Sequence, residues 1–354
     1  MAEPTLRYGI IGTGMMGHEH ARNLALLPGA EVVAYSDPSS EQRWWTAQLV
    51  PDAKGYEDHR ELLRDDALDA VVVASPNHTH AAVLADVFTS GKHVLCEKPL
   101  CTTVEDARKV MERAEKHPGV FWVGMEYRYM APIARLLQEV RGGTVGTLRM
   151  LAIREHRYPF LPKVGDWNRF SRNTGGTFVE KCCHFFDLMR LITASEPVRV
   201  YASASMDVNH RDESYDGQRP DILDNGFVTV DFASGARGLL DLCMFAEASR
   251  NEQEIAVTGD AGKVECFVPE STVVIGRRQP REVKTVTLDV DRDVLAAGAH
   301  HGSTFAEHQA FREAILSGGE PAVSARDGLL AVAMGVAAER SALEGRPVEI
   351  AELL

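Results

Sequence analysis

Three side chains that could do acid–base chemistry are spaced to share one face of a helix. Glu180 and His184 are four residues apart, and Asp187 follows three residues later, in a helical pattern from about residue 175 to 192. Residues three and four apart are neighbours on a helix surface. A neutral imidazole, with an ordinary pKa of about 6.5, can take a hydroxyl proton at cellular pH. The spacing is compatible with an acid–base pair; the alternative is that Glu180 and His184 only cap and solvate the helix.

A second constellation, in residues 6–37, has the order strand, glycine turn, helix, strand, acid. Gly12 allows a tight turn, Gly14 allows the backbone to approach a pyrophosphate, and Gly17 allows close packing of helix on strand. The N-terminus of the helix offers N–H groups to phosphates. Asp37 ends the second strand, where a carboxylate can accept hydrogen bonds from both ribose hydroxyls. Its charge would repel a 2′-phosphate, so the stretch predicts NAD in preference to NADP.

These residues need two different frameworks to position them. Strands and helices alternate up to about residue 125, and the apolar run 69–75 is typical of a strand buried in a parallel sheet. Beyond Tyr127, long alternating strands dominate. We predict an α/β protein with an N-terminal Rossmann domain, a doubly wound parallel sheet, over residues 1–125. Residues 126–354 are predicted to form an α+β domain with a large, open, mainly antiparallel sheet, for substrate binding and oligomerisation, whose C-terminal helix can pack back on the first domain.

Composition excludes several other classes. A net charge of −13 disfavours binding to a nucleic-acid backbone, and no apolar run approaches the ~20 residues of a membrane span. The N-terminal segment MAEPTLRYG has no apolar stretch typical of a signal peptide. The six cysteines form no CxxC pair, so we predict reduced thiols, no metal site and a cytoplasmic location.

The glycine turn, the segment Glu97-Lys98-Pro99 and the stretch GGTFVEKCCHFFDLMRLI together resemble the glucose–fructose oxidoreductase/inositol dehydrogenase/rhizopine-catabolism (Gfo/Idh/MocA) family. The resemblance covers nearly the whole chain, including SPNHTH and GKHVLCEKPL. It implies an NAD(P)-dependent dehydrogenase that oxidises a hydroxyl of a sugar, inositol or related polyol. It also implies a homodimer or homotetramer formed through the open sheet.

The resemblance further implies a catalytic set of Lys98, Glu180 and His184. Lys98 would donate to the substrate oxygen and favour alkoxide character. This chain has Glu180 where the family typically has aspartate and Cys182 where it has glycine. Glutamate keeps the carboxylate one methylene further out. We interpret Cys182 and Cys183 as buried, because adjacent helical cysteines point apart and no second ligand pair accompanies them.

The remaining predicted contacts follow from the positions of polar and aromatic side chains around these motifs. A sugar offers hydroxyls and an apolar ring face, which such side chains can bind. Arg128 follows the last strand of the first domain, and could instead brace the boundary between domains. The predicted cofactor contacts are Gly12, Gly14, Met15, Met16, Gly17, Asp37, Ser75, Asn77, His78, Glu97 and Lys98, and the predicted substrate contacts are Lys98, Arg128, Arg154, His156, Trp167, His184 and His301.

Two alternative functions stay open at the level of sequence. The same fold can retain NAD tightly and use transient oxidation to modify a sugar or cleave a glycosidic bond without net redox change. It can also serve as a non-catalytic sugar- or dinucleotide-sensing protein, which the presence of Lys98 and His184 disfavours.

Overall fold

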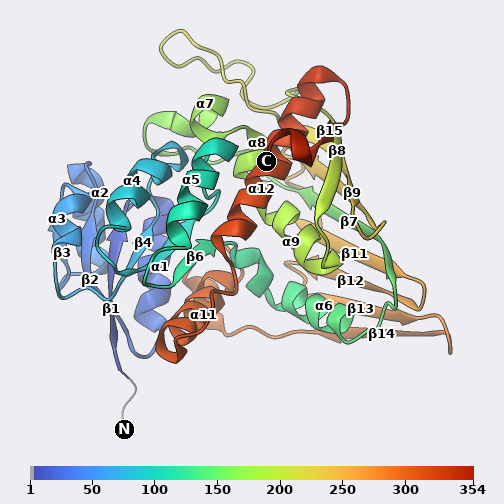
Figure 1. Cartoon of the computed structure of the whole chain (residues 1–354), viewed down its shortest axis with the longest axis horizontal. Coiled ribbons are helices and arrows are strands. Elements are labelled where there is room, and N and C mark those ends of the chain that lie inside the picture. The colour runs from blue at the N-terminus through green and yellow to red at the C-terminus, as the bar shows by residue number, and fades with distance from the viewer. Residues whose placement is uncertain (1–3) are drawn as a thin grey trace. The chain divides into compact units, whose positions relative to one another are not determined.

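The computed structural model describes residues 4–354 (Figure 1). Residues 1–3, which begin the segment in which we found no signal peptide, lie outside the described part. The chain divides into two compact units. The first comprises the chain up to Glu126 with residues 163–165 and 291–330, and the second comprises residues 127–162, 166–290 and 331–354. The predicted domain boundary at residue 125 stays a prediction.

The first unit is built on a parallel sheet of six strands in the order β3-β2-β1-β4-β5-β6 (Figure 1). Apolar runs form its centre: all four residues of β4 are buried, as sequence analysis predicted for a strand covered on both faces. The strands are β1 (Leu6–Ile11), β2 (Ala30–Ser36), β3 (Lys54–Tyr56), β4 (Ala70–Val73), β5 (His93–Glu97) and β6 (Phe121–Gly124).

Helices connect these strands, and polar side chains begin several of them. Ser39 accepts a hydrogen bond from the Gln42 N–H at the start of α2, and Thr103 accepts one from the Asp106 N–H at the start of α5. The helices of this unit are α1 (Met15–Leu26), α2 (Ser40–Leu49), α3 (His59–Leu63), η1 (Asn77–Thr79), α4 (His80–Val87), α5 (Val104–Ala114), α10 (Arg292–Ala296) and α11 (Ser303–Ser317).

The second unit contains a nine-stranded sheet in the order β14-β13-β12-β11-β7-β10-β9-β8-β15. All of its neighbouring strands are antiparallel except β7 and β10, which are parallel. The predicted fold class is therefore confirmed. The strands are β7 (Leu148–His156), β8 (Pro197–Ser205), β9 (Asn225–Phe232), β10 (Arg237–Cys243), β11 (Gln253–Gly259), β12 (Gly262–Val268), β13 (Thr272–Arg277), β14 (Glu282–Thr287) and β15 (Val348–Glu349).

One face of the second sheet packs on helices and forms the core of the unit. Leu151 and Ile153 of β7 share this core with Phe185 and Phe186 of α9. Alternate residues of the strands point to the other face, where large apolar side chains such as Met150 are exposed. The helices with residues in this unit are η2 (Glu126–Tyr129), α6 (Ala131–Arg141), η3 (Val164–Arg169), α7 (Ser171–Thr174), α8 (Thr177–Glu180), α9 (Cys183–Thr193), α12 (Ala325–Glu344) and η4 (Ile350–Glu352).

No helix of residues 4–354 combines the length and the apolar character needed to cross a membrane. Helix α12 has residues in both units, because the division between them falls after Leu330.

Candidate active site

The glycine turn after β1 has the geometry that a bound dinucleotide requires. Gly12 has a φ of +88°, and a Cβ there would lie 2.5 Å from the backbone nitrogen of Ser75. A Cβ at Gly17 would lie 2.2 Å from the carbonyl oxygen of Gly12. A Cβ at Gly14, which precedes α1, would meet no atom within 4 Å. The first and third glycines are therefore needed for packing, whereas the second keeps the approach to the N-terminus of α1 open.

Asp37 is held beside this turn by backbone groups. Its Oδ2 accepts a hydrogen bond from the Thr13 N–H at 2.8 Å, and its Oδ1 accepts one from the Ser39 N–H at 2.9 Å. Arg43, six residues later, donates to the backbone oxygen of Asp37 at 2.6 Å and pairs with Glu57 at 3.7 Å. An arginine is therefore closer to Asp37 than the sequence suggested, but these contacts direct its guanidinium to a carbonyl and to another carboxylate.

Two buried polar atoms at the carboxyl edge of the first sheet indicate that a ligand fits there. Thr13 Oγ1 and Asn77 Nδ2 have no hydrogen-bond partner among residues 4–354. Buried polar groups are normally satisfied, so each fits a polar group of a cofactor. Of the other predicted cofactor contacts, Met15 and His78 are exposed, Met16 and Ser75 are half-buried, and the Ser75 hydroxyl accepts from Thr79.

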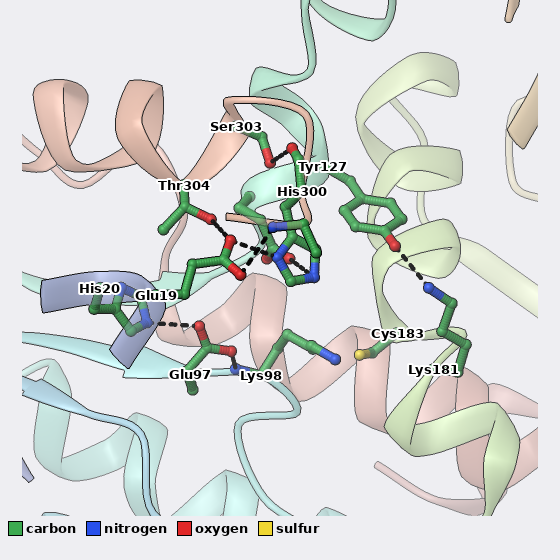
Figure 2. Close-up of polar contacts among 12 residues, drawn as sticks. Glu19, His20, Glu97, Lys98, Tyr127, Lys181, Cys183, His300, Ser303 and Thr304 are labelled. Atoms are coloured by element: carbon green, nitrogen blue, oxygen red, sulfur yellow. Dashed lines mark hydrogen bonds and ion pairs between the residues drawn. The ribbon is translucent and has the colours of Figure 1, made fainter. Parts of the chain in front are cut away.

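Lys98 follows the carboxyl end of β5, next to a buried Glu97 (Figure 2). Oε1 of Glu97 accepts a hydrogen bond from Nε2 of His20 at 2.8 Å, and its Oε2 accepts one from the Lys98 N–H at 3.1 Å. Burial raises the pKa of Glu97, but the hydrogen bond and charge of His20, together with the charges of Lys98 and His300, hold this pKa below its usual value. Glu97 therefore acts as an anion that fixes the backbone from which Lys98 extends.

His184 lies near the start of α9 in the second unit and is buried. Its imidazole stacks on the ring of Tyr127, with a centroid distance of 3.9 Å and an interplanar angle of 4°. Stacking against a rigid ring restricts the orientation of the imidazole. The predicted general base is thus held in one plane by an aromatic side chain that sequence analysis did not select.

Tyr127 is in turn held by a buried ion pair that sequence analysis also missed. Lys181 donates to the Tyr127 hydroxyl at 2.6 Å, as Figure 2 shows, and pairs with Glu155 at 2.9 Å. Glu155 also accepts a hydrogen bond from Gln253 at 2.9 Å. The alternation of β7 offered a signal, because it places Glu155 on the same face as the core residues Leu151 and Ile153.

The predicted helix over residues 175–192 is interrupted between Glu180 and His184. Helix α8 ends at Glu180 and α9 begins at Cys183, and the Cys182 N–H bonds five residues back, to the carbonyl of Thr177. Glu180 and His184 are therefore not on one continuous helix. Both are buried, as are Cys182 and Cys183, and burial raises the pKa of the Cys182 thiol well above its usual value.

Arg128 and Asp187 form a buried ion pair, with 2.6 Å between Nε of Arg128 and Oδ2 of Asp187. This contact lies within the second unit and joins η2 to α9, and both interpretations of Arg128 stay predictions. Asp187, three residues after His184, thus holds this arginine.

Arg154 and His156 lie on the exposed face of the second sheet, so the structure does not bring them together with His184. Arg154 pairs with Asp241 and Glu254, and His156 bonds to Asp241 at 3.0 Å. The physical reason is the period of two along β7, which turns Glu155 to the core and its two neighbours outward. Their role as substrate contacts stays a prediction.

The last two predicted substrate contacts lie in irregular segments. Trp167, in η3, is half-buried, and its carbonyl accepts a hydrogen bond from Asn173. His301 precedes α11 with a left-handed φ of +54°. Lys98 and His301 belong to the first unit, whereas Trp167, Glu180 and His184 belong to the second. Among residues 4–354, no group of three or more His, Cys, Asp or Glu side chains could hold a metal ion.

Comparison with known proteins identifies the family. The model of the GFO_IDH_MocA oxidoreductase family, NAD-binding Rossmann fold, matches residues 6–125, and that of its C-terminal alpha/beta domain matches residues 138–350. Myo-inositol 2-dehydrogenase of Thermotoga maritima is 31% identical over 99% of this chain and 100% of its own length. The scyllo-inositol 2-dehydrogenase (NAD(+)) of Bacillus subtilis strain 168 is 26% identical, over 98% and 97%.

A solved structure of a probable dehydrogenase from Thermotoga maritima is 30% identical, covers 99% of this chain and 100% of its own, and superposes with a TM-score of 0.80. The resemblance predicted from sequence is confirmed. The chain belongs to the Gfo/Idh/MocA oxidoreductase family and is an NAD-dependent oxidoreductase.

Proposed function

We propose that the protein oxidises a secondary hydroxyl of a cyclic polyol, with inositols as the first candidates and related sugars next. The observation that carries this proposal is similarity to a myo-inositol 2-dehydrogenase over the full length of both chains. The side chains support it, because Lys98 extends from the cofactor-binding edge and His184 is a buried, oriented imidazole.

The chain's residues would divide the reaction between them. The glycine turn and Asp37 would hold NAD, which would supply the acceptor for the hydride of the alcohol carbon. Lys98 donates a hydrogen bond to the hydroxyl oxygen and stabilises the negative charge that develops there. His184 takes the hydroxyl proton, Tyr127 keeps the imidazole in its plane, and the Glu180 carboxylate orients the site.

A substrate panel tests this proposal. Purified protein is mixed with NAD or NADP and with myo-inositol, scyllo-inositol and simple aldoses, and the absorbance of reduced nicotinamide is followed. We expect NADH to accumulate with an inositol and NADPH to form much more slowly. Chemical change of a sugar without NADH would favour the redox-neutral alternative, and binding without any turnover would favour the sensing protein.

We also propose that the chain is a homodimer or homotetramer. The uncovered face of the second sheet exposes apolar side chains, among them Met150 and Phe227, each 58% exposed. Exposed apolar patches of this kind are typical of interfaces. Sedimentation at the monomer mass would contradict this proposal.

A cytoplasmic location is proposed on separate grounds. All six cysteines are free thiols, and five of them are buried. Thiols persist in reducing compartments. Fractionation of the source cells would test the location.

A further inference from the structure

In the first unit, His300 lies between two buried carboxylates. Its Nδ1 is 2.7 Å from Oε1 of Glu19, and its Nε2 is 3.8 Å from Oε1 of Glu126. The side chains of Glu19 and Glu126 are 6% and 2% exposed, whereas that of His300 is 23% exposed. Figure 2 shows Glu19, His300 and Thr304 converging. His300 is therefore the member of the group that meets solvent.

Glu19 fixes the protonation of the imidazole. It accepts hydrogen bonds from His300, from the hydroxyl of Thr304 at 2.9 Å and from the Ala299 N–H at 3.2 Å. Burial alone would raise the pKa of Glu19, but these hydrogen bonds and the charge of His300 lower it to about 2. An ionised carboxylate only accepts, so Nδ1 of His300 carries a proton. In the neutral ring, Nε2 then presents its lone pair toward Glu126.

The pKa of Glu126 is shifted in the opposite direction to that of Glu19. Burial raises the pKa of Glu126 to about 7; the nearby charges of His300 and Lys98 lower it, and that of Glu97 raises it. Glu126 follows β6, which pairs with β5 so that Gly124 lies opposite Glu97. Glu126 is thus at the strand edge that bears Lys98, and its carboxyl exchanges a proton near neutral pH.

We propose that Glu126 and His300 carry the proton released by alcohol oxidation from the Lys98 strand edge to solvent, with Glu19 as the residue that positions His300. This rests on the proposed function, since each secondary alcohol oxidised by NAD yields a ketone, NADH and one proton. The proton, after leaving the base, enters on the Glu126 carboxylate and passes to Nε2 of His300. The imidazolium releases it to bulk water, and both side chains return to their starting states.

The gap between Glu126 and His300 is too long for a direct hydrogen bond. A bridging water or a rotation of the half-exposed imidazole would close it. Glu19 suits the positioning role in either case, because its charge stabilises the imidazolium and its pKa is too low for it to accept the proton itself.

The test is chemical rescue of turnover on the inositol substrate. Removing the imidazole in His300→Ala should lower kcat by about 10-fold in dilute buffer, and added free imidazole should restore most of it, because a diffusing base replaces the missing carrier. The matched control is His59→Ala: His59 also belongs to the first unit, pairs with a carboxylate, Asp86, at 2.9 Å, and has a 20% exposed side chain. It should keep wild-type kcat and show no response to imidazole.

An unchanged kcat for His300→Ala in dilute buffer, or a loss that imidazole does not restore while NAD binding is intact, would overturn the relay. If this variant does not fold, His300→Gln, whose amide can still donate to Glu19, is tested in the same way. Glu126→Gln should lower kcat without rescue, since free imidazole cannot replace a buried carboxylate. These results are distinct from a failure of the proposed function, in which the wild-type protein itself would reduce no NAD.

Discussion

The carboxyl edge of the first sheet and the helix-covered face of the second sheet hold their functional groups in different ways. At the first, Gly12, Gly14 and Gly17 shape the backbone, and Asp37 accepts from the Thr13 N–H, 24 residues away. On the second, side chains distant in sequence hold one another: Lys181 contacts Tyr127 across 54 residues, and Gln253 contacts Glu155 across 98.

The two regions should therefore respond differently to mutation. The cofactor edge uses backbone N–H groups, which most side-chain substitutions elsewhere leave in place. The second face depends on buried charges, and removing one partner leaves the other without compensation. We therefore expect substitutions on the second face to affect chemistry and folding, and substitutions at the first edge to affect cofactor choice.

The largest expected effect is on the proposed base. His184→Ala should lower kcat by about 10²–10⁴-fold, because no other group of the stack would take the hydroxyl proton. NAD affinity, measured by fluorescence titration, should stay near that of the wild type. Near-normal turnover would transfer the role of base to Lys98, and a parallel loss of NAD affinity would contradict the separation of the two regions.

The next effect is on folding. Lys181→Met leaves the fully buried Glu155 with Arg157, at 3.4 Å, as its remaining cationic partner, and should lower the free energy of unfolding by about 3 kcal/mol in denaturant titrations. Adding Glu155→Gln should recover much of this loss. The matched control is Lys263→Met, which removes a partly exposed ammonium that pairs with Glu265 at 2.6 Å and should cost below about 1 kcal/mol. Equal losses for the two lysines would refute the buried-charge account.

Two buried glutamates, Glu19 and Glu339, should contribute to stability with opposite dependence on pH. The pKa of Glu19 is lowered to about 2, so its contribution is present above its usual value of 4.5 and lost as pH falls toward 2. Burial raises the pKa of Glu339, which accepts from the Phe178 N–H at the start of α8, to about 7. Its contribution is fully present below 4.5 and lost as pH rises through about 7.

The unfolding free energy of the wild type should therefore decline between pH 4.5 and about 7, where Glu339 ionises. Glu339→Gln should make this decline smaller by about 3 kcal/mol. The measurement is a series of denaturant titrations at increasing pH. An identical slope for wild type and variant would show that this carboxyl does not titrate in that window.

The smallest effect is expected at the cofactor edge. Asp37→Ala should lower the preference for NAD over NADP, as a ratio of kcat/KM values, by about 10–100-fold, since the charge that repels the 2′-phosphate is lost. Turnover with NAD should fall less. An unchanged preference would mean that Arg43 or the glycine turn, and not Asp37, selects the cofactor.

Sequence reasoning succeeded where a function is encoded by neighbours along the chain. The spacing of Gly12, Gly14 and Gly17 and the acid at Asp37 requires one strand–turn–helix–strand geometry, and the structure has it. The continuous apolar run of β4 and the alternation of β7 likewise predicted two different sheets, because burial on two faces and on one face impose different patterns.

Sequence reasoning did not identify the contacts that join distant segments of the chain. Sequence analysis selected Arg154 and His156 of β7 by type but not Glu155, which the alternation of the strand places on the core face. Nothing local to Lys181 indicates that it would turn inward at the interruption between α8 and α9 to meet Tyr127 and Glu155. Sequence analysis also did not select His300, because only the folded turn brings its imidazole to Glu19 and Glu126.

The central claim is that the first unit holds NAD while the chain removes a hydride from a polyol carbon. It is tested most directly by incubating the wild-type protein with NAD and perdeuterated myo-inositol, followed by mass spectrometry of the nicotinamide product. We expect free reduced cofactor that carries a single deuterium, together with an inosose. Unlabelled or absent reduced cofactor, with altered substrate, would contradict the claim and support a redox-neutral enzyme that keeps its NAD bound.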